Sequence, residues 1–431
     1  MNILLKNITL VDPASALDGK SVDVLIREGV YERIGNALKA DGVDEGLDCT
    51  GLHMSGGWFD MRSAFGEPGA EQKETIRSGQ QAAAAGGFTG VLLMPTTSPP
   101  LQSASDISFV KGRASQHAVE VYPCGVMTDG GEGKDVSGMY DMRLAGAAAF
   151  TDGKRWVRDS GLMLRLMQYA EGIGARLISY MDDPGLTAKR SVNESSNTVV
   201  LGMKGMPPVA EKIALQRDLN LIDYTGIPLH ISGISTAESV LEIARAKAAG
   251  MPVTAEVYAY HLLLDDSELG GFDSLLKTMP PLRSVSDVEA LRKAVLDGTI
   301  DVVCSDHAPH EVEVKSVEFD FAAFGMIGLE SCFSVLNTAF DGQLPLQRLV
   351  DVLVTNPRRI LGLPVPLIRE GETANFTVFN RSGKLIFSEA HIASRSSNSP
   401  LIGRPLQGYP VLCGNNGYLH RCPQGHSTAK N

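Results

Sequence analysis

The sequence predicts a (β/α)8 barrel with a small β-sandwich domain that is assembled from both ends of the chain. Short apolar runs separated by turn residues occupy residues 1–55 and return in the tail, 367–431, which is typical of β-sheet. Between them, residues 56–366 alternate strand-like and helix-like segments. This alternation favours a parallel sheet covered by helices, and a barrel with an appended domain fits a chain of 431 residues.

Short apolar runs in the middle region predict eight strands, at residues 57–60, 89–94, 119–126, 146–151, 175–180, 228–234, 253–257 and 300–305. Helical patterns lie between several of them, at residues 73–85, 161–171, 237–249 and 285–296. Eight strands with intervening helices fit a barrel better than an open sheet, although the number of strands alone allows either. In a barrel the chemistry lies at the carboxyl ends of the strands, so those residues are the candidates for a site.

The composition argues against several classes of function. A net charge of −11 is unfavourable for binding nucleic acid or an anionic membrane surface. The six cysteines are scattered without the spacing of a metal finger, which is typical of free thiols in a reducing compartment. The first residues lack the apolar core of a signal peptide, and no run approaches membrane-spanning length. We therefore expect a cytoplasmic protein with neither a nucleic-acid nor a membrane partner.

The end of the eighth predicted strand carries the strongest polar cluster of the chain, Asp306-His307-Ala308-Pro309-His310. Asp306 in such a position is suited to act as a metal ligand or a general base, with the imidazoles orienting a substrate. The alternative is that Asp306 caps the following turn and His307 packs beneath it. The residues themselves do not decide between these two interpretations.

The other histidines indicate a core rather than a metal site. His230 and His261 lie in apolar surroundings, where a hydrogen-bonded core histidine is more common than a ligand. Among the nine histidines, only His307 and His310 have short ligand spacing. One pair does not define a catalytic zinc site, which typically needs three protein ligands.

The first predicted strand has the frame of a metal-hydrolase strand without its metal ligands. A hydrophobic run is followed by Asp60, by alternate positions that point into the barrel mouth, and by a Glu-Pro-Gly motif at 67–69. A working site of this kind has a His-x-His pair at the alternate positions, which here are Arg62 and Ala64. Neither side chain can ligate a divalent metal.

An ordered series of motifs over nearly the whole chain resembles dihydroorotase of the cyclic amidohydrolase superfamily. The matching segments are 67–69 with Lys73-Glu74-Thr75, 82–89, Gly205-Met206-Pro207-Pro208 with Glu211, 235–239, 252–257, Pro280-Pro281-Leu282-Arg283, 305–310, and 324–325 through 328–330. Each motif alone is weak, and their common order is what indicates the fold.

The resemblance implies a degenerate metal site. Active members use one or two divalent metals, zinc among them, to generate a hydroxide that attacks a cyclic amide, and a strand-eight Asp shuttles the proton. The ligand positions fall here on Arg62, Ala64, Asp152, Tyr180, Gly233 and Asp306. Among these positions only Asp152 and Asp306 carry side chains that can ligate a metal. We therefore expect no intact metal site and no cofactor. Asp306 also occupies the position of the general base in the family. Without a metal, we expect Arg62 to neutralise Asp152 or Asp306.

The substrate side is also changed. The positions at which the resemblance places residues that grip the substrate carboxylate are Gly66, Thr96 and Met279. His310 alone remains at a substrate-contact position. Loss of metal ligands and carboxylate contacts together indicates a site that no longer carries out its chemistry.

The sequence therefore predicts a catalytically inactive dihydroorotase-like protein of pyrimidine biosynthesis with a structural role. The resemblance implies aspartate carbamoyltransferase as the partner, and we expect a homo-oligomer. A second hypothesis is a metal-independent or otherwise altered cyclic-amide hydrolase. A third is an active dihydroorotase with ligands elsewhere. The second hypothesis would use Asp306, His307, His310, Asp152, Tyr180 and Arg62 as an acid–base cluster.

Overall fold

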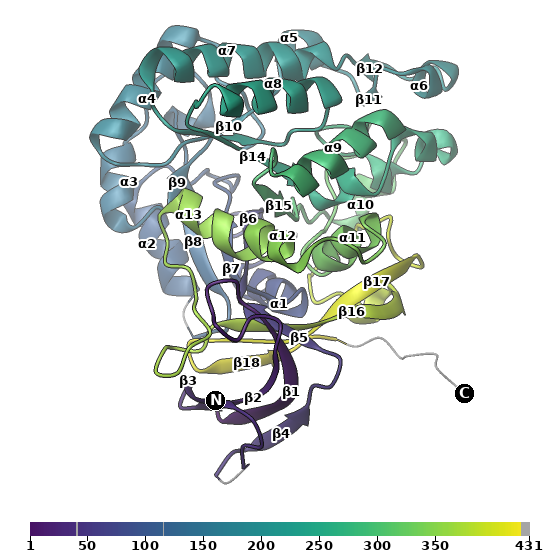
Figure 1. Cartoon of the computed structure of the whole chain (residues 1–431). Coiled ribbons are helices and arrows are strands. Elements are labelled where there is room, and N and C mark those ends of the chain that lie inside the picture. Colours follow the sequence, from purple (N-terminus) through teal and green to yellow (C-terminus); the bar gives the residue numbers. More distant parts are fainter. Residues whose placement is uncertain (40–41, 115, 424–431) are drawn as a thin grey trace.

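The computed structural model describes residues 1–39, 42–114 and 116–423 (Figure 1). Helices surround a barrel of parallel strands, and a β-sandwich domain built from both chain ends lies below the barrel in the view of Figure 1. The predicted fold class is confirmed. The domain boundaries after residues 55 and 366 remain a prediction.

Eight parallel strands form the barrel: β6 (Trp58–Ser63), β7 (Phe88–Leu93), β8 (Glu120–Gly125), β9 (Ala149–Phe150), β10 (Ile178–Tyr180), β13 (Leu229–Ser232), β14 (Val253–Tyr258) and β15 (Val302–Cys304). Strands β6 to β9 pair in order, and so do β10, β13, β14 and β15. Parallel bridges from Phe150 to Leu177 and from Ser63 to His307 join the two halves. Each barrel strand overlaps one of the eight predicted runs.

The main helices are α1 (Ile76–Ala85), α2 (Ala104–Arg113), α3 (Met139–Ala145), α4 (Ser160–Gly172), α7 (Val209–Thr225), α8 (Ala237–Ala248), α9 (Val285–Asp297), α11 (Cys332–Ala339), α12 (Leu346–Val350) and α13 (Asn356–Leu361). The helix predicted from residue 73 begins at Ile76. The Thr75 side chain accepts a hydrogen bond from the Ser78 N–H and caps the helix there, which ends the preceding turn.

Short elements complete the connections. They are α5 (Pro184–Thr187), α6 (Ser196–Val200), α10 (Val312–Lys315), β11 (Val192–Asn193), β12 (Gly205–Met206), the 3-10 turns η1 (Asp129–Gly131), η2 (Ala259–Leu262), η3 (Asp266–Gly271), η4 (Ser274–Leu276) and η6 (Glu389–His391), and the π-helical turn η5 (Asp351–Thr355).

The β-sandwich domain combines strands from the two termini. The first segment contributes β1 (Ile3–Val11), β2 (Ser21–Arg27), β3 (Val30–Gly35), β4 (Glu45–Asp48) and β5 (His53–Gly56), and the second contributes β16 (Phe376–Ile386), β17 (Pro405–Asn415) and β18 (Tyr418–Arg421). The strand order is β18-β17-β16-β5-β1-β2-β3, with β4 paired to β1. The antiparallel pairing of β5 with β16 joins the two termini into one sheet.

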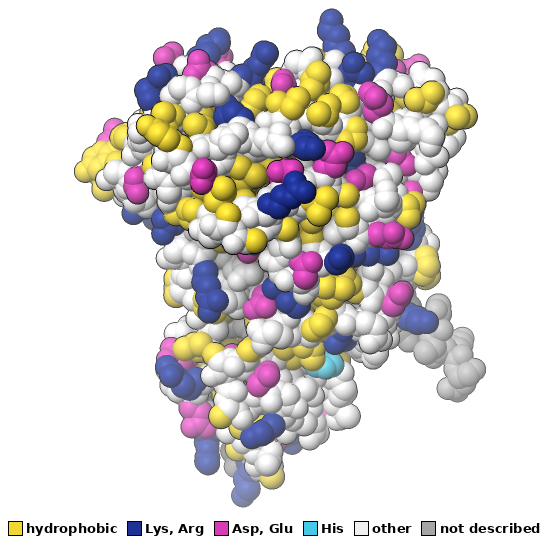
Figure 2. Space-filling view, turned by 45° about the horizontal axis from the view of Figure 1, so that its top comes forward, with side chains coloured by type: hydrophobic (Ala, Val, Ile, Leu, Met, Phe, Trp, Pro, Cys, Tyr) yellow, Lys and Arg dark blue, Asp and Glu magenta, His cyan; other side chains and the backbone are white. Residues whose placement is uncertain are grey.

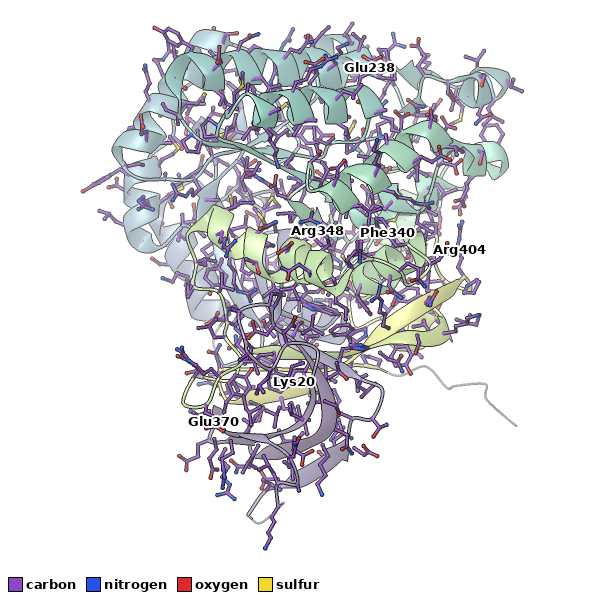
Figure 3. All side chains as sticks on the ribbon, viewed as in Figure 1. Lys20, Glu238, Phe340, Arg348, Glu370 and Arg404 are labelled. Carbon is purple, nitrogen blue, oxygen red and sulfur yellow. The ribbon has the colours of Figure 1, made fainter. Side chains whose placement is uncertain are left out.

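Aromatic packing joins this domain to the barrel and positions the first barrel strand. Trp58 at the start of β6 is fully buried, and its ring centroid lies 4.7 Å from that of Phe333 on α11 and 5.4 Å from that of Phe379 on β16. Arg348 on α12, labelled in Figure 3, donates to the Ile300 carbonyl oxygen just before β15. These contacts fix the starts of β6 and β15, whose other ends carry the candidate site residues.

No helix among the described residues is long and apolar enough to cross a membrane. All six cysteines are free and buried.

Candidate functional site

A pocket of about 270 Å³ opens at the carboxyl ends of the barrel strands. The residues that follow β6, β7, β9 and β15 line it. We call this pocket the mouth pocket. Its lining includes seven residues that were singled out from the sequence: Arg62, Ala64, Gly66, Thr96, Asp306, His307 and His310. Its lining does not include Asp152, Tyr180, Gly233 or Met279.

The carboxylate of Asp306 is the centre of the site. Its Oδ1 accepts a hydrogen bond from Arg62 Nε at 3.1 Å, and its Oδ2 accepts from Lys154 Nζ at 2.6 Å and from the Tyr260 hydroxyl at 2.8 Å. The side chains of Arg62 and Asp306 are each only 3% exposed. The sequence left open whether Arg62 pairs with Asp152 or with Asp306. In the structure Arg62 pairs with Asp306, and Lys154 binds the same carboxylate as a second cation.

A second layer of hydrogen bonds continues from Arg62 into the barrel. Arg62 Nη1 donates to Ser232 Oγ at 3.0 Å, and Ser232 Oγ donates to Glu256 Oε1 at 2.5 Å. The other Glu256 oxygen lies 3.2 Å from His230 Nε2, and His230 Nδ1 lies 2.8 Å from Thr254 Oγ1. His230 is therefore the hydrogen-bonded core histidine that was predicted.

The charges of these two layers balance. Arg62 and Lys154 supply two cations, and Asp306 and Glu256 supply two carboxylates. Burial alone would lower the pKa of Arg62, but Tyr258, Asp306 and Glu256 outweigh burial and raise it. Burial lowers the pKa of Lys154; Asp306 opposes this change and Arg62 adds to it. Burial would raise the pKa of Glu256, but its hydrogen-bond partners and Arg62 lower it, which keeps this carboxylate charged.

Two buried tyrosine rings fill the space beside Arg62. The guanidinium carbon lies 5.8 Å from the Tyr180 ring centroid and 5.6 Å from the Tyr258 ring centroid, within the range of a cation–π interaction. Gly233 has a φ of 73°, and a Cβ atom there would lie 2.8 Å from the Tyr258 hydroxyl and 2.9 Å from the Tyr180 ring. The absence of a side chain at 233 therefore makes room for both rings.

Asp152 is not available to a metal, which corrects the expectation that it is a competent ligand. Its Oδ1 accepts from the backbone N–H groups of Met127 at 2.8 Å and Thr128 at 3.0 Å, and its Oδ2 accepts from the Thr128 hydroxyl at 2.6 Å. Both oxygens thus hold the loop that follows β8. The sequence identifies a carboxylate at this strand end but does not show which way it points.

His307 and His310 have mainly structural partners. His307 Nδ1 accepts from the backbone N–H groups of 328–329, and its Nε2 lies 3.6 Å from a Glu74 oxygen, so this ring packs beneath the loop. His310 Nε2 donates to the Phe324 carbonyl at 2.9 Å. Burial lowers the pKa of His310 to about 4, so the ring is neutral at pH 7. Asp306, with a φ of 49°, forms the ion pair instead of capping the turn.

The positions expected to grip a substrate carboxylate provide no cation. A Cβ atom at Gly66 would lie 1.9 Å from the Ala70 carbonyl oxygen, so the backbone there has no room for any side chain. Thr96 lines the mouth pocket with a neutral hydroxyl, and Met279 lies outside its lining.

These residues do not fit the divalent metal that the resemblance implies. Within the described part of the chain, no group of three or more His, Cys, Asp or Glu side chains is arranged to hold a metal ion. Asp152 and Asp306 each have both oxygens bound to protein donors. The Arg62 guanidinium and the Lys154 ammonium beside Asp306 would also repel a second cation.

Lys154, Tyr260 and Ser232 are among the participants that were not predicted as site residues. Lys154 stands two positions after Asp152 at the fourth strand end, so a search of strand ends for cations as well as ligands would have found it. Ser232 reaches the site from β13, and Tyr260 reaches it from η2, the turn after β14. Nothing in their local sequence indicates this role, because their contacts depend on closure of the barrel.

Comparisons with known proteins agree with this fold. The family model described as "Dihydro-orotase-like" matches residues 54–239, and that of the amidohydrolase family matches residues 190–402. The dihydroorotase of Pelotomaculum thermopropionicum is 42% identical over 414 residues, which cover 95% of this chain and 96% of the relative. That of Carboxydothermus hydrogenoformans is 39% identical over 417 residues, 96% of each chain.

Solved structures with the same fold are more distant in sequence. The L-hydantoinase (dihydropyrimidinase) from Arthrobacter aurescens has a TM-score of 0.85 at 22% identity, covering 98% of this chain and 97% of the other. A dihydropyrimidinase from Brevibacillus agri has a TM-score of 0.83 at 21% identity, covering 98% and 95%. At these identities the likeness shows the fold alone.

Replacement of Arg62 tests the central ion pair. Arg62→Met leaves Asp306 with one cation fewer in a buried position, and we expect the free energy of unfolding to fall by about 3–5 kcal/mol in urea denaturation. The control is Arg245→Met, which breaks an exposed pair with Glu242 and should cost less than about 1 kcal/mol. Equal stability of the two variants would contradict the structural importance of the Arg62–Asp306 pair.

His261 should make stability depend on pH. Burial lowers its pKa to about 3, with Arg283 adding to the effect. Because the folded pKa lies below the unfolded value of about 6.5, the stabilisation is complete above that pH. It is lost as the pH falls toward 3, by about 1.4 kcal/mol per pH unit. His261→Gln should therefore show a shallower loss of unfolding free energy between pH 6.5 and 4 in urea titrations; an unchanged slope would show that His261 does not contribute.

Proposed function

This chain belongs to the dihydroorotase family, and we propose that it is a catalytically inactive member with a structural role in pyrimidine biosynthesis. The observation that carries the proposal is the cluster in which Arg62 and Lys154 neutralise Asp306 at 3.1 and 2.6 Å. Amide hydrolysis of the family type needs a metal-activated hydroxide and a free carboxylate to move a proton. This cluster supplies neither, because the donor set does not fit a metal and Asp306 is bound on both oxygens.

The substrate side supports the same proposal. The buried backbone around Gly66 has no room for a side chain that could hold a substrate carboxylate. His310, at the remaining substrate-contact position, uses Nε2 to hold the loop at Phe324. Asp306 and His310 therefore act, in this proposal, as a buried structural carboxylate and a loop-anchoring histidine.

We propose aspartate carbamoyltransferase as the partner, a homo-oligomeric state, and a cytoplasmic location. Family membership motivates the partner, and the absence of disulfides among six buried cysteines is consistent with a reducing compartment. Exposed hydrophobic side chains suited to association occur on α7, α8 and α9, and Figure 2 shows hydrophobic groups on that face. They include Ile213, Tyr224, Leu241 and Val285.

A second candidate function is a metal-independent hydrolase of a cyclic amide. It is favoured by one observation, the contact of Lys154 and Tyr260 with the same Asp306 oxygen at the mouth pocket. Of the acid–base cluster suggested by the sequence, Arg62 and Asp306 are in contact and Tyr180 lies beside them. Asp152 and His307 are engaged elsewhere.

Metal content and activity measured on one preparation test the inactive assignment. We expect purified protein to hold far less than one zinc per chain by mass spectrometry and to show no hydrolysis of dihydroorotate with added zinc or manganese. The control is an active dihydroorotase prepared in the same way. Stoichiometric zinc with clear hydrolysis would overturn the proposal, and hydrolysis that persists in a chelator would favour the metal-independent enzyme.

Association is tested by size-exclusion chromatography of the chain mixed with the aspartate carbamoyltransferase of the same organism. We expect the two proteins to elute together. Because the proposed role does not use the mouth pocket, Lys73→Met should co-elute equally well. Separate elution of the wild-type chain at all salt concentrations would contradict the proposed partner.

A further inference from the structure

One surface segment combines exposed apolar side chains with acidic ones. Residues 311–321 have the sequence Glu-Val-Glu-Val-Lys-Ser-Val-Glu-Phe-Asp-Phe and contain α10 and the turn that follows it (Figure 1). Phe321 is 80% exposed, Val312 is 65% exposed, and Val314 and Val317 are 38% and 40% exposed. Apolar groups that gather on a surface among polar ones typically mark a site of association with another molecule. We call residues 312–321 the acidic strip.

Buried contacts on the inner side of the acidic strip hold it in place. Phe319 is only 5% exposed, and its ring centroid lies 5.7 Å from Lys277 Nζ. The same Nζ donates to the Asp320 carbonyl oxygen at 2.8 Å. Lys315 Nζ donates to the Ala323 carbonyl oxygen at 2.9 Å. Because these contacts fix the backbone in the free protein, association through the strip requires little further ordering.

Two exposed acids of the strip have no neutralising cation. Glu313 and Glu318 are both exposed. Neither side chain forms an ion pair or a hydrogen bond with a residue in the part of the chain that the structure describes. Their carboxylates therefore face solvent beside the exposed valines and Phe321, and they can contact the cationic groups of another molecule.

The other charges near the strip largely cancel one another. They form three electrostatically interacting pairs: Asp320 with Lys277, Asp273 with Lys315, and Glu311 with Lys73. These neighbours leave the negative charge of Glu313 and Glu318 in place. The strip therefore presents an apolar surface with a negative rim.

The sign of this charge selects the occupant. A second copy of the chain that docked through the same strip would place like charges opposite each other, which is unfavourable. An anionic membrane surface is repelled for the same reason. A protein surface with lysine or arginine side chains around apolar groups is complementary in both properties.

We propose that the acidic strip is a docking surface for a protein partner that presents lysine or arginine side chains around an apolar contact. Phe321 and Val312 form the contact, and Glu313 and Glu318 bind the cations. This inference goes beyond the proposed function, because it concerns a different surface from that on α7, α8 and α9. It holds whether or not the barrel is catalytically active.

The probe for this surface is a synthetic peptide of alternating lysine and leucine residues with a fluorescent label. Fluorescence anisotropy measures its binding to the whole chain. A lysine–serine peptide keeps the charge without the apolar groups, and a glutamate–leucine peptide keeps the apolar groups with the opposite charge. We expect only the lysine–leucine peptide to bind tightly, and its affinity to fall as sodium chloride is added, since salt screens exposed charges.

Two variants of the strip, each with a matched control, test where the peptide binds. Phe321→Ser should weaken binding by about tenfold or more, as loss of one buried aromatic contact implies. Leu144→Ser removes a similarly exposed apolar side chain from α3 and should leave the affinity unchanged. Glu318→Lys should weaken binding severalfold, whereas Glu289→Lys makes the same change of charge on α9 and should not.

A photoreactive group on the peptide locates the contact directly, and mass spectrometry should find its adducts within residues 312–321. The proposal would be overturned by equal binding of the lysine–serine peptide, by full affinity in Phe321→Ser, or by adducts confined to α7, α8 or α9. It would also be overturned if Phe321→Ser sedimented as a smaller oligomer than the wild-type chain, because a second copy would then cover the strip.

The replaced side chains are all exposed, so the variants should remain folded, which circular dichroism can verify. None of these measurements depends on zinc content or on hydrolysis of dihydroorotate. Failure of this proposal is therefore distinguishable from failure of the proposed function.

Discussion

The neutralisation of one buried carboxylate organises the barrel mouth. Asp306 is almost fully buried, and an unpaired charge in such a place would cost several kcal/mol, a large part of the 5–15 kcal/mol that typically separates folded from unfolded protein. Arg62 and Lys154 remove that cost from two different strand ends. Arg62 in turn needs Ser232 and Glu256 beneath it and the tyrosine rings beside it. The charge of Asp306 therefore accounts for residues on or just after five other strands, β6, β9, β10, β13 and β14.

The sequence predicts the barrel well because its strands are set by local patterns. Short apolar runs between helical patterns place all eight strands, and the capped start of α1 differs only by the few residues that Thr75 decides. The pairing of Arg62 with a carboxylate could also be anticipated, because a buried acid without a metal needs a cation. The choice of Asp306 over Asp152 could not, since it depends on the direction of each side chain.

The remaining site contacts cannot be predicted from local sequence patterns, because they join distant parts of the chain. Lys154 and Asp306 are 152 residues apart, and Arg62 and Ser232 are 170 apart. Such pairs meet only when the barrel closes. The positions also depend on one another: a side chain at Gly233 would collide with Tyr180 and Tyr258, and one at Gly66 would collide with the backbone. A return to imidazole ligands would therefore need several simultaneous replacements, not one.

Asp152 shows that a carboxylate at an expected ligand position can have a structural role. Its carboxylate ties the loop after β8 to the fourth strand end through Met127 and Thr128. Selection for folding alone would preserve an acid there, with no contribution from catalysis. Counting retained ligand residues in related chains would then overstate how many are active enzymes. The direction in which a retained carboxylate points is a better guide to activity than its presence.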